Sequence, residues 1–152
     1  MIDSGLATKK HTLQGDFMAL FEWTPTLSVG VTEMDDQHKK LIDIINRLNE
    51  AMKTGKAKEV LAPILKEMAD YTVYHFGVEE GYMQKFGYAG LASQKTEHKK
   101  YVDRMNELNR DFSSGKLMIT LDVMTFLKEW LSKHIQGTDR QYTKLFNEKG
   151  LK

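Results

Sequence analysis

Residues 71–80 read Tyr71-Thr72-Val73-Tyr74-His75-Phe76-Gly77-Val78-Glu79-Glu80. On an α-helix, four residues correspond to about 400° of rotation, so the imidazole of His75 and the carboxylate of Glu79 leave the same face about one turn apart. Both groups bind borderline metals such as iron and zinc. Most pairs of this kind are surface pairs, so the meaning of this one depends on whether other helices supply further ligands.

The composition predicts one soluble domain. The chain has 152 residues, of which 41% are hydrophobic and 28% charged, and its formal net charge of +1 gives no indication of a nucleic-acid surface. The chain contains no cysteine, so any metal must be held by nitrogen and oxygen ligands. No apolar run approaches the roughly 20 residues that cross a membrane. No secretory signal follows Lys9 and Lys10, and we therefore expect a cytoplasmic protein.

The periodicity of apolar residues predicts an all-α protein. Stripes at i, i+3, i+4 and i+7 predict long helices at about 34–53, 57–85, 91–113 and 117–136, with a short C-terminal helix at about 139–147. Because the turns between them are short, we expect an up-down-up-down four-helix bundle.

Two segments precede the first predicted helix. Residues 1–20 lack periodicity and predict an irregular N-terminal arm, in which we expect His11 to be solvated. The predicted domain is 21–152. Its first segment, 21–31, contains Pro25 and Gly30 and is expected to cross the helices in an extended form and to cover one end of the core.

Each of the four long helices carries a histidine on its apolar face. These histidines are His38, His75, His98 and His134. Four imidazoles and the two carboxylates Glu79 and Asp139 would be costly to bury without partners. A metal centre would satisfy them all, and two carboxylates suggest two metals because carboxylates bridge readily in bundle cores.

Asp139 fits this pattern only if the helix is irregular. It lies five residues after His134, which on a regular helix points it about 140° away from that histidine. Gly137 lies between the two, so a local break or a π-type bulge is expected to return Asp139 to the centre.

The strings that carry these residues resemble the hemerythrin family. They are Asp35-Asp36-Gln37-His38, His75-Phe76-Gly77-Val78-Glu79-Glu80, Glu97-His98 and Trp130-Leu131-Ser132-Lys133-His134-Ile135-Gln136-Gly137-Thr138-Asp139. The resemblance covers about 18–152, and the segment from Trp23 to Val29 is similar to that of single-domain bacterial members, the bacteriohemerythrins.

The resemblance implies a non-haem di-iron site that binds dioxygen reversibly. By this resemblance, His38 and His75 hold the iron with an open position, and His98 and His134 belong to the second iron. Glu79 and Asp139 bridge the two irons together with an oxo or hydroxo group. Leu131 would line the oxygen pocket, although it reads equally well as a core leucine.

One position departs from the family pattern, which has His-x3-His on the third helix. Here the first of these histidines is replaced by Gln94. Three outcomes are open: Gln94 ligates through its amide oxygen, Gln94 holds a water in that place, or the second iron is under-coordinated and exchangeable. We expect the change to make autoxidation faster.

Three functions are considered for the chain. The first is dioxygen binding for storage, delivery or sensing, which would make the chain a non-enzyme that serves a partner oxygen-using enzyme. The second is a di-iron oxidase, peroxidase or NO-handling enzyme that uses the altered iron position, although the paired Glu-x-x-His motifs of ferritin-like oxidases are absent. The third is a signalling module whose output lies in another protein. Dioxygen is the expected ligand, without nucleic acid or membrane, and a monomer is expected.

Overall fold

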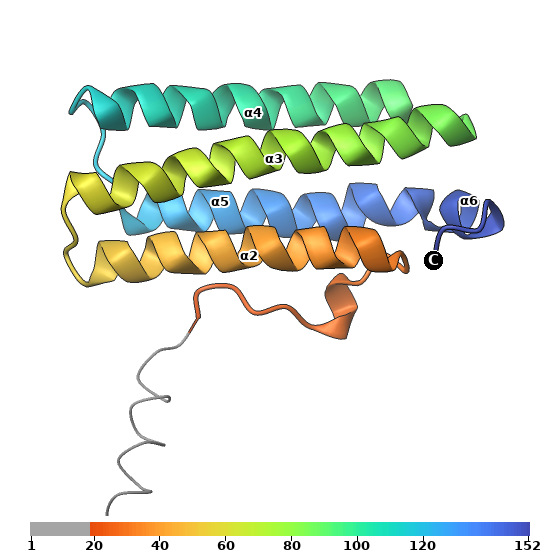
Figure 1. Cartoon of the computed structure of the whole chain (residues 1–152), viewed down its shortest axis with the longest axis horizontal. Helices are drawn as coiled ribbons and strands as arrows, with labels where there is room; N and C mark the ends of the chain where they lie inside the picture. Colours follow the sequence, from red (N-terminus) through yellow and green to blue (C-terminus); the bar gives the residue numbers. More distant parts are fainter. Residues whose placement is uncertain (1–18) are drawn as a thin grey trace, which may run out of the picture.

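The computed structural model describes residues 19–152. Four long helices make up the domain: α2 (Thr32–Lys53), α3 (Lys58–Phe86), α4 (Leu91–Ser113) and α5 (Leu121–Lys133). Consecutive helices run in opposite directions, with α3 and α4 side by side on one side of the bundle (Figure 1). There is no strand within residues 19–152. The predicted all-α, up-down-up-down four-helix bundle is therefore confirmed, while His11 and nearly all of the predicted arm lie outside the described residues.

Three shorter helical segments follow α5, and one precedes α2. A π-helical turn, η2 (His134–Thr138), continues α5, and a 3₁₀ segment, η3 (Asp139–Tyr142), leads into α6 (Thr143–Glu148). The 3₁₀ turn η1 (Pro25–Leu27) lies in the segment before α2.

The predicted start of the fourth helix was wrong by four residues. Residues 117–120 precede α5, and Thr120 is its N-cap, with extended backbone angles and an Oγ1 that accepts from Val123 N at 3.4 Å. The side-chain oxygen of a threonine at an N-cap accepts a hydrogen bond from one of the first free N–H groups of the helix. This favours a helix that begins directly after Thr120 over one that begins at residue 117. The first helix likewise begins at Thr32 rather than 34, with Val31 as its N-cap and no side-chain cap.

The core consists of the apolar stripes that the sequence predicts. Leu41, Ile44 and Leu48 of α2 are 0–1% exposed, as are Met68 of α3 and Met105 of α4. Each such side chain contributes roughly 1.5–3 kcal/mol when fully buried.

The segment before α2 lies against the bundle, as predicted. Asn46 of α2 fixes its start, because its side-chain amide donates to Phe21 O (2.7 Å) and accepts from Phe21 N (3.0 Å). At its end, Asn147 Nδ2 of α6 donates to Gly30 O at 3.0 Å. The segment is thereby attached at both of its ends, and it runs along α2 toward the end of the bundle where α6 lies, rather than covering that end as predicted (Figure 1).

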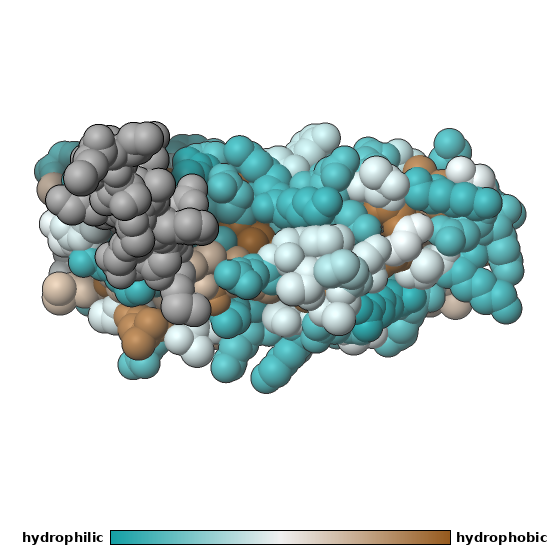
Figure 2. Space-filling model, turned by 90° about the horizontal axis from the view of Figure 1, so that it is seen from below, coloured by the Kyte–Doolittle hydropathy of each residue, from teal (hydrophilic) through white to brown (hydrophobic). Residues whose placement is uncertain are grey.

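One face of the molecule can be described from its surface view. The face in Figure 2 is largely hydrophilic, with scattered hydrophobic residues between the charged ones. Within the described residues, no helix is both long enough and apolar enough to cross a membrane.

Candidate metal centre

The centre begins with the pair on α3. His75 and Glu79 are both fully buried, and His75 Nε2 lies 2.8 Å from Glu79 Oε1. The one-turn spacing of the two residues therefore holds in the structure, and both side chains face the bundle interior rather than solvent.

The π turn brings Asp139 to the same place. The N–H of Asp139 donates to the carbonyl of His134, which is the i→i+5 bond of a π-helix. Five residues then make about one full turn, and His134 Nε2 lies 3.0 Å from Asp139 Oδ1. The predicted helix irregularity between these residues is confirmed.

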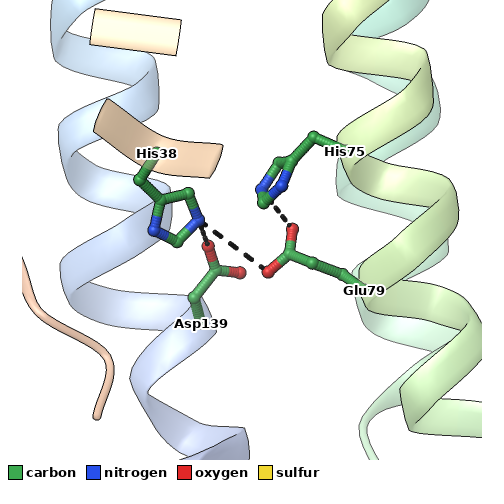
Figure 3. A group of neighbouring side chains, drawn as sticks. All are labelled: His38, His75, Glu79 and Asp139. Atoms are coloured by element: carbon green, nitrogen blue, oxygen red, sulfur yellow. Dashed lines mark ion pairs between the residues drawn. The ribbon is translucent and has the colours of Figure 1, made fainter. Parts of the chain in front are cut away.

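All six predicted site residues converge on two overlapping groups. His38, His75, Glu79 and Asp139 form one group, which Figure 3 shows with the side chains pointing toward one another. Glu79, His98, His134 and Asp139 form the other. Within each group the donor atoms lie within 4.8 Å of one another, which is a spacing that one ion could bridge. The two carboxylates are common to both groups.

The outer nitrogens of three histidines are held by acceptors, which fixes their protonation. His75 Nδ1 donates to Gln37 Oε1 (2.7 Å). His98 Nδ1 donates to Glu80 Oε2 (3.1 Å), and His134 Nδ1 donates to Glu97 Oε2 (2.8 Å). Because each Nδ1 carries a proton toward its acceptor, each Nε2 is left to face the interior of the cluster, as in metal-binding histidines.

Burial sets the protonation of the metal-free cluster. It lowers the pKa of His75 to about 4 and that of His98 to about 3. Burial together with the nearby Asp139 raises the pKa of Glu79 to about 8. Burial opposes a charge on His134 as well, but the carboxylates of Asp139, Glu79 and Glu97 raise its pKa to about 9.

Several polar atoms of the cluster have no hydrogen-bond partner. They are both nitrogens of His38, His75 Nε2, Glu79 Oε1, Gln94 Oε1 and Asp139 Oδ2. At His75 and Glu79, an unprotonated nitrogen faces a carboxyl oxygen at 2.8 Å, so the two atoms need a proton or a cation between them. A cation between them would satisfy both, and the residues present therefore fit a group of bound metal ions.

Gln94 lies at the edge of the second group. It is 1% exposed, and its Nε2 donates to Asp139 Oδ1 (3.2 Å) and to Thr138 O (3.4 Å). The reverse amide orientation would set Oε1 against a carboxylate, so the partners fix Oε1 as the atom without a hydrogen bond.

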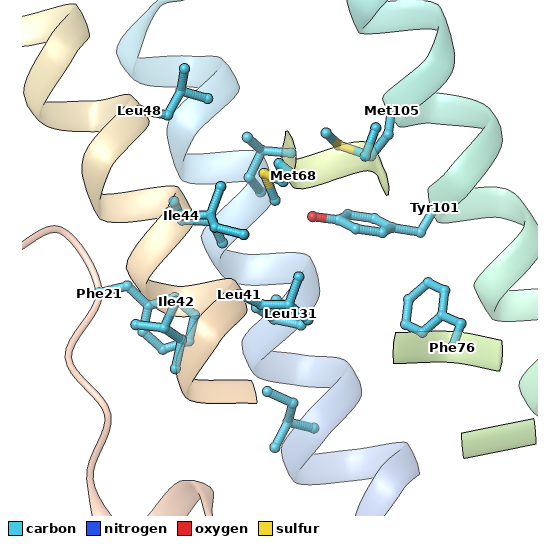
Figure 4. Close-up of a cluster of buried hydrophobic side chains, with 14 of the residues drawn as sticks. Phe21, Leu41, Ile42, Ile44, Leu48, Met68, Phe76, Tyr101, Met105 and Leu131 are labelled. Atoms are coloured by element: carbon cyan, nitrogen blue, oxygen red, sulfur yellow. The ribbon is translucent and has the colours of Figure 1, made fainter. Parts of the chain in front are cut away.

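Leu131 lies in the apolar layer next to the cluster. It is 1% exposed and belongs to the buried hydrophobic cluster in the centre of the bundle, which also contains Leu41, Phe76 and Tyr101 (Figure 4). This position is compatible with both meanings that the sequence left open, a pocket residue and a core leucine.

Sequence reasoning gave no role to four residues that the structure adds to the cluster. Three are Gln37, Glu80 and Glu97, each directly before or after a site histidine or carboxylate in the chain. The fourth is Tyr142, whose hydroxyl donates to Glu79 Oε2 at 2.7 Å and is fully buried. Tyr142 lies three residues after Asp139, which is about one helical turn, and this spacing could have predicted that its side chain lies beside the cluster.

Comparison with known proteins supports one family. Residues 29–146 match the family model for the hemerythrin HHE cation binding domain. Bacteriohemerythrin from Methylococcus capsulatus is 38% identical over 82% of this chain and 95% of its own length. A hemerythrin-like protein from Naegleria gruberi is 34% identical over 80% of this chain and 90% of its own.

Solved structures agree with the sequence matches. A crystal structure of wild-type hemerythrin has a TM-score of 0.80 with 36% identity, covering 84% of this chain and 98% of that one. The relatives bear names of hemerythrins and not of enzymes, in agreement with the prediction of a non-enzyme. The family model, the relatives and the shared fold together show that this chain belongs to the hemerythrin family.

Proposed function

We propose that this protein binds dioxygen reversibly at a non-haem di-iron centre. The observation that carries the proposal is the pair of overlapping ligand groups, each with two imidazoles, joined by two buried carboxylates whose free oxygens lack partners. Membership of the hemerythrin family supports iron as the metal and dioxygen as the ligand. Two bound ferrous ions would supply the two electrons that reversible dioxygen binding takes up.

The site residues would bind two metal ions at two neighbouring positions. His38 and His75 would hold the ion with the open position, and His98 and His134 the other ion, with Glu79 and Asp139 bridging them. Gln37, Glu80 and Glu97 would orient the imidazoles through Nδ1, and Tyr142 would fix one oxygen of Glu79.

Apolar side chains would keep water from the open position. Leu41, Leu131 and Ile135 are 0–1% exposed, and Phe76 is 2% exposed. A dry surrounding slows the loss of charged oxygen species, because these need water or protons to leave. The same residues would therefore favour release of neutral dioxygen.

The test is a spectrum of the iron-loaded protein under cycled air. Ferrous protein prepared without oxygen should gain a visible band in air and lose it on degassing, over several cycles. A band that forms once and gives ferric protein with turnover of a reductant would instead support the alternative, a di-iron oxidase, peroxidase or NO-handling enzyme. The buried oxygen of Gln94 is the observation that favours this alternative, because it leaves the second position less saturated with imidazole.

The Gln94→His variant gives a second measurement. If Gln94 leaves the second metal position with more oxygen ligands than nitrogen ligands, the air-induced band should decay faster in the wild type than in this variant. Equal decay rates would show that residue 94 does not control autoxidation.

A further inference from the structure

The two halves of the cluster are built from different donors. The first group offers two imidazole nitrogens, from His38 and His75, and two carboxylates. The second group offers His98 and His134, the same two carboxylates, and next to them the free amide oxygen of Gln94. With a histidine at position 94, this second group would have three nitrogens and two carboxylates. Here it has two nitrogens and three sources of oxygen.

The amide oxygen is held ready to bind. Gln94 lies one helical turn before His98 on α4, so the two side chains leave the same face. Its Nε2 is attached to Asp139 and to the carbonyl of Thr138, which leaves little freedom to the amide. Its oxygen is buried without any donor, and an acceptor in that state is costly unless a cation or a water meets it.

The two halves also differ in charge. Carboxylates accept from the Nδ1 atoms of His98 and His134, through Glu80 and Glu97. On the other side, His75 has the neutral amide of Gln37, and His38 Nδ1 has no partner among the described residues. A carboxylate that accepts a hydrogen bond from the Nδ1 of an imidazole raises the basicity of that imidazole. The second group lacks a third imidazole, and its two imidazoles are therefore the more basic ligands. The negative charge of this half therefore favours a bound cation.

We propose that the two ion positions have different metal preferences, and that Gln94 makes the position at His98 and His134 take a harder, more oxygen-preferring divalent ion than the position at His38 and His75. Imidazole suits zinc and iron, whereas carboxylate and carbonyl oxygens suit manganese and magnesium. Exchanging one nitrogen for an amide oxygen shifts the balance toward manganese. The inference rests on the proposed function only for the presence of two ions and does not require that they bind dioxygen.

Competition between Mn²⁺ and Zn²⁺ tests the proposal. Metal-free protein is loaded with Mn²⁺ without oxygen, Zn²⁺ is added stepwise, and released Mn²⁺ is measured by its aqueous EPR signal. The wild type should release Mn²⁺ in two steps. In Gln94→His, one step should move to Zn²⁺ concentrations lower by about tenfold or more, while the other stays in place, since changes around metal ligands typically alter affinity by about 10- to 100-fold.

Two further variants control for other causes. Gln94→Leu removes the oxygen and should hold one Mn²⁺ fewer per chain than the wild type. Gln84→His adds an imidazole at an exposed position of α3 and should leave both steps unchanged, which excludes a general effect of an added histidine. Far-UV circular dichroism of each metal-free variant confirms that the bundle is intact.

The outcomes separate this inference from the proposed function. If Gln94→His leaves both steps where the wild type has them, or if Gln94→Leu holds as much Mn²⁺ as the wild type, the inference is overturned. If the wild type binds a single ion, both the inference and the two-ion centre are overturned. If Mn²⁺ leaves in two steps, of which one depends on Gln94, but no reversible band forms in air, only dioxygen binding is overturned.

Discussion

Removal of the metal should leave a protein whose stability is greatest near pH 6.5. Four buried groups of the cluster determine this, because each of them changes its protonation between the folded and unfolded states within the range of about pH 3 to 9. Burial lowers the pKa of His75 to about 4 and that of His98 to about 3. Glu79 is raised to about 8 by burial and the nearby Asp139, and His134 to about 9 by the surrounding carboxylates, against the effect of burial.

The two histidines with lowered pKa values destabilise the fold in acid. In an unfolded chain they take up protons below about pH 6.5, whereas in the folded protein they stay neutral until about pH 4 and 3. The unfolded state therefore binds more protons in this range. Their contribution to stability is complete above pH 6.5 and is lost as the pH falls through the folded pKa values.

The two groups with raised pKa values act in the opposite direction. Glu79 keeps its proton in the folded protein up to about pH 8, and His134 keeps its proton up to about pH 9. Unfolded, they lose these protons near pH 4.5 and 6.5, which are their ordinary values. Stability from these groups is present below those ordinary values and is lost as the pH rises through 8 and 9.

The magnitudes follow from the number of protons. One proton difference changes the free energy of unfolding by about 1.4 kcal/mol per pH unit. Below about pH 5.5, where the histidines of the unfolded chain are fully protonated, two histidines oppose one carboxyl, so stability should fall by about 1.4 kcal/mol per unit of acidification. Between pH 6.5 and 8, Glu79 and His134 act together, and the loss should reach at most about 4 kcal/mol.

Urea unfolding of chelator-treated protein, followed by far-UV circular dichroism, measures this dependence. Free energies of unfolding at about pH 4.5, 6.5 and 8 should pass through a maximum at the middle value. The Glu79→Gln variant cannot titrate at this site and should lose about half as much stability between pH 6.5 and 8. Stability of the metal-free wild type that stays level or rises over that range would refute the reasoning.

Metal-loaded protein provides the internal comparison. A bound cation requires the deprotonated form of Glu79 and the neutral form of His134, so metal binding releases their protons. The loss of stability that these two groups cause above about pH 6.5 in the metal-free protein is therefore absent from the loaded protein. The loaded protein should therefore become more stable, relative to the metal-free protein, as the pH rises from about 6.5 to 8.

The positions of the ligands could be predicted because they depend on helical period. The histidines lie on apolar stripes, and a stripe that is buried carries its histidine into the core, as found for all four. Even the irregular placement of Asp139 followed from angle arithmetic, since five residues do not make a whole α-helical turn.

The partners of these ligands could not be predicted, because they depend on how the helices pack. Gln37 precedes His38 in the chain, yet its side chain reaches His75 on the next helix. Glu80 and Glu97 had no predicted role, and their side chains are 25% and 42% exposed. Only the distance between neighbouring helices decides which acid reaches which imidazole.

Three further substitutions test particular contacts. Tyr142→Phe removes the hydroxyl that donates to buried Glu79 and should lower the free energy of unfolding by about 1–3 kcal/mol, measured by urea unfolding. Gly30→Ala should cost about 1–2 kcal/mol in the same measurement, because φ is +69° and a Cβ would lie 2.9 Å from a methyl of Thr143; equal stability would contradict this. Gly137→Ala should instead be neutral or stabilise by up to about 1 kcal/mol, since a Cβ there meets nothing within 4 Å and alanine favours helix. The number of metal ions that the Gly137→Ala variant binds shows whether packing or the glycine itself causes the π turn. If packing causes it, the variant binds as many ions as the wild type. If the glycine itself causes it, alanine would restore a regular helix, turn residue 139 by about 140° away from the cluster and reduce the number of ions bound.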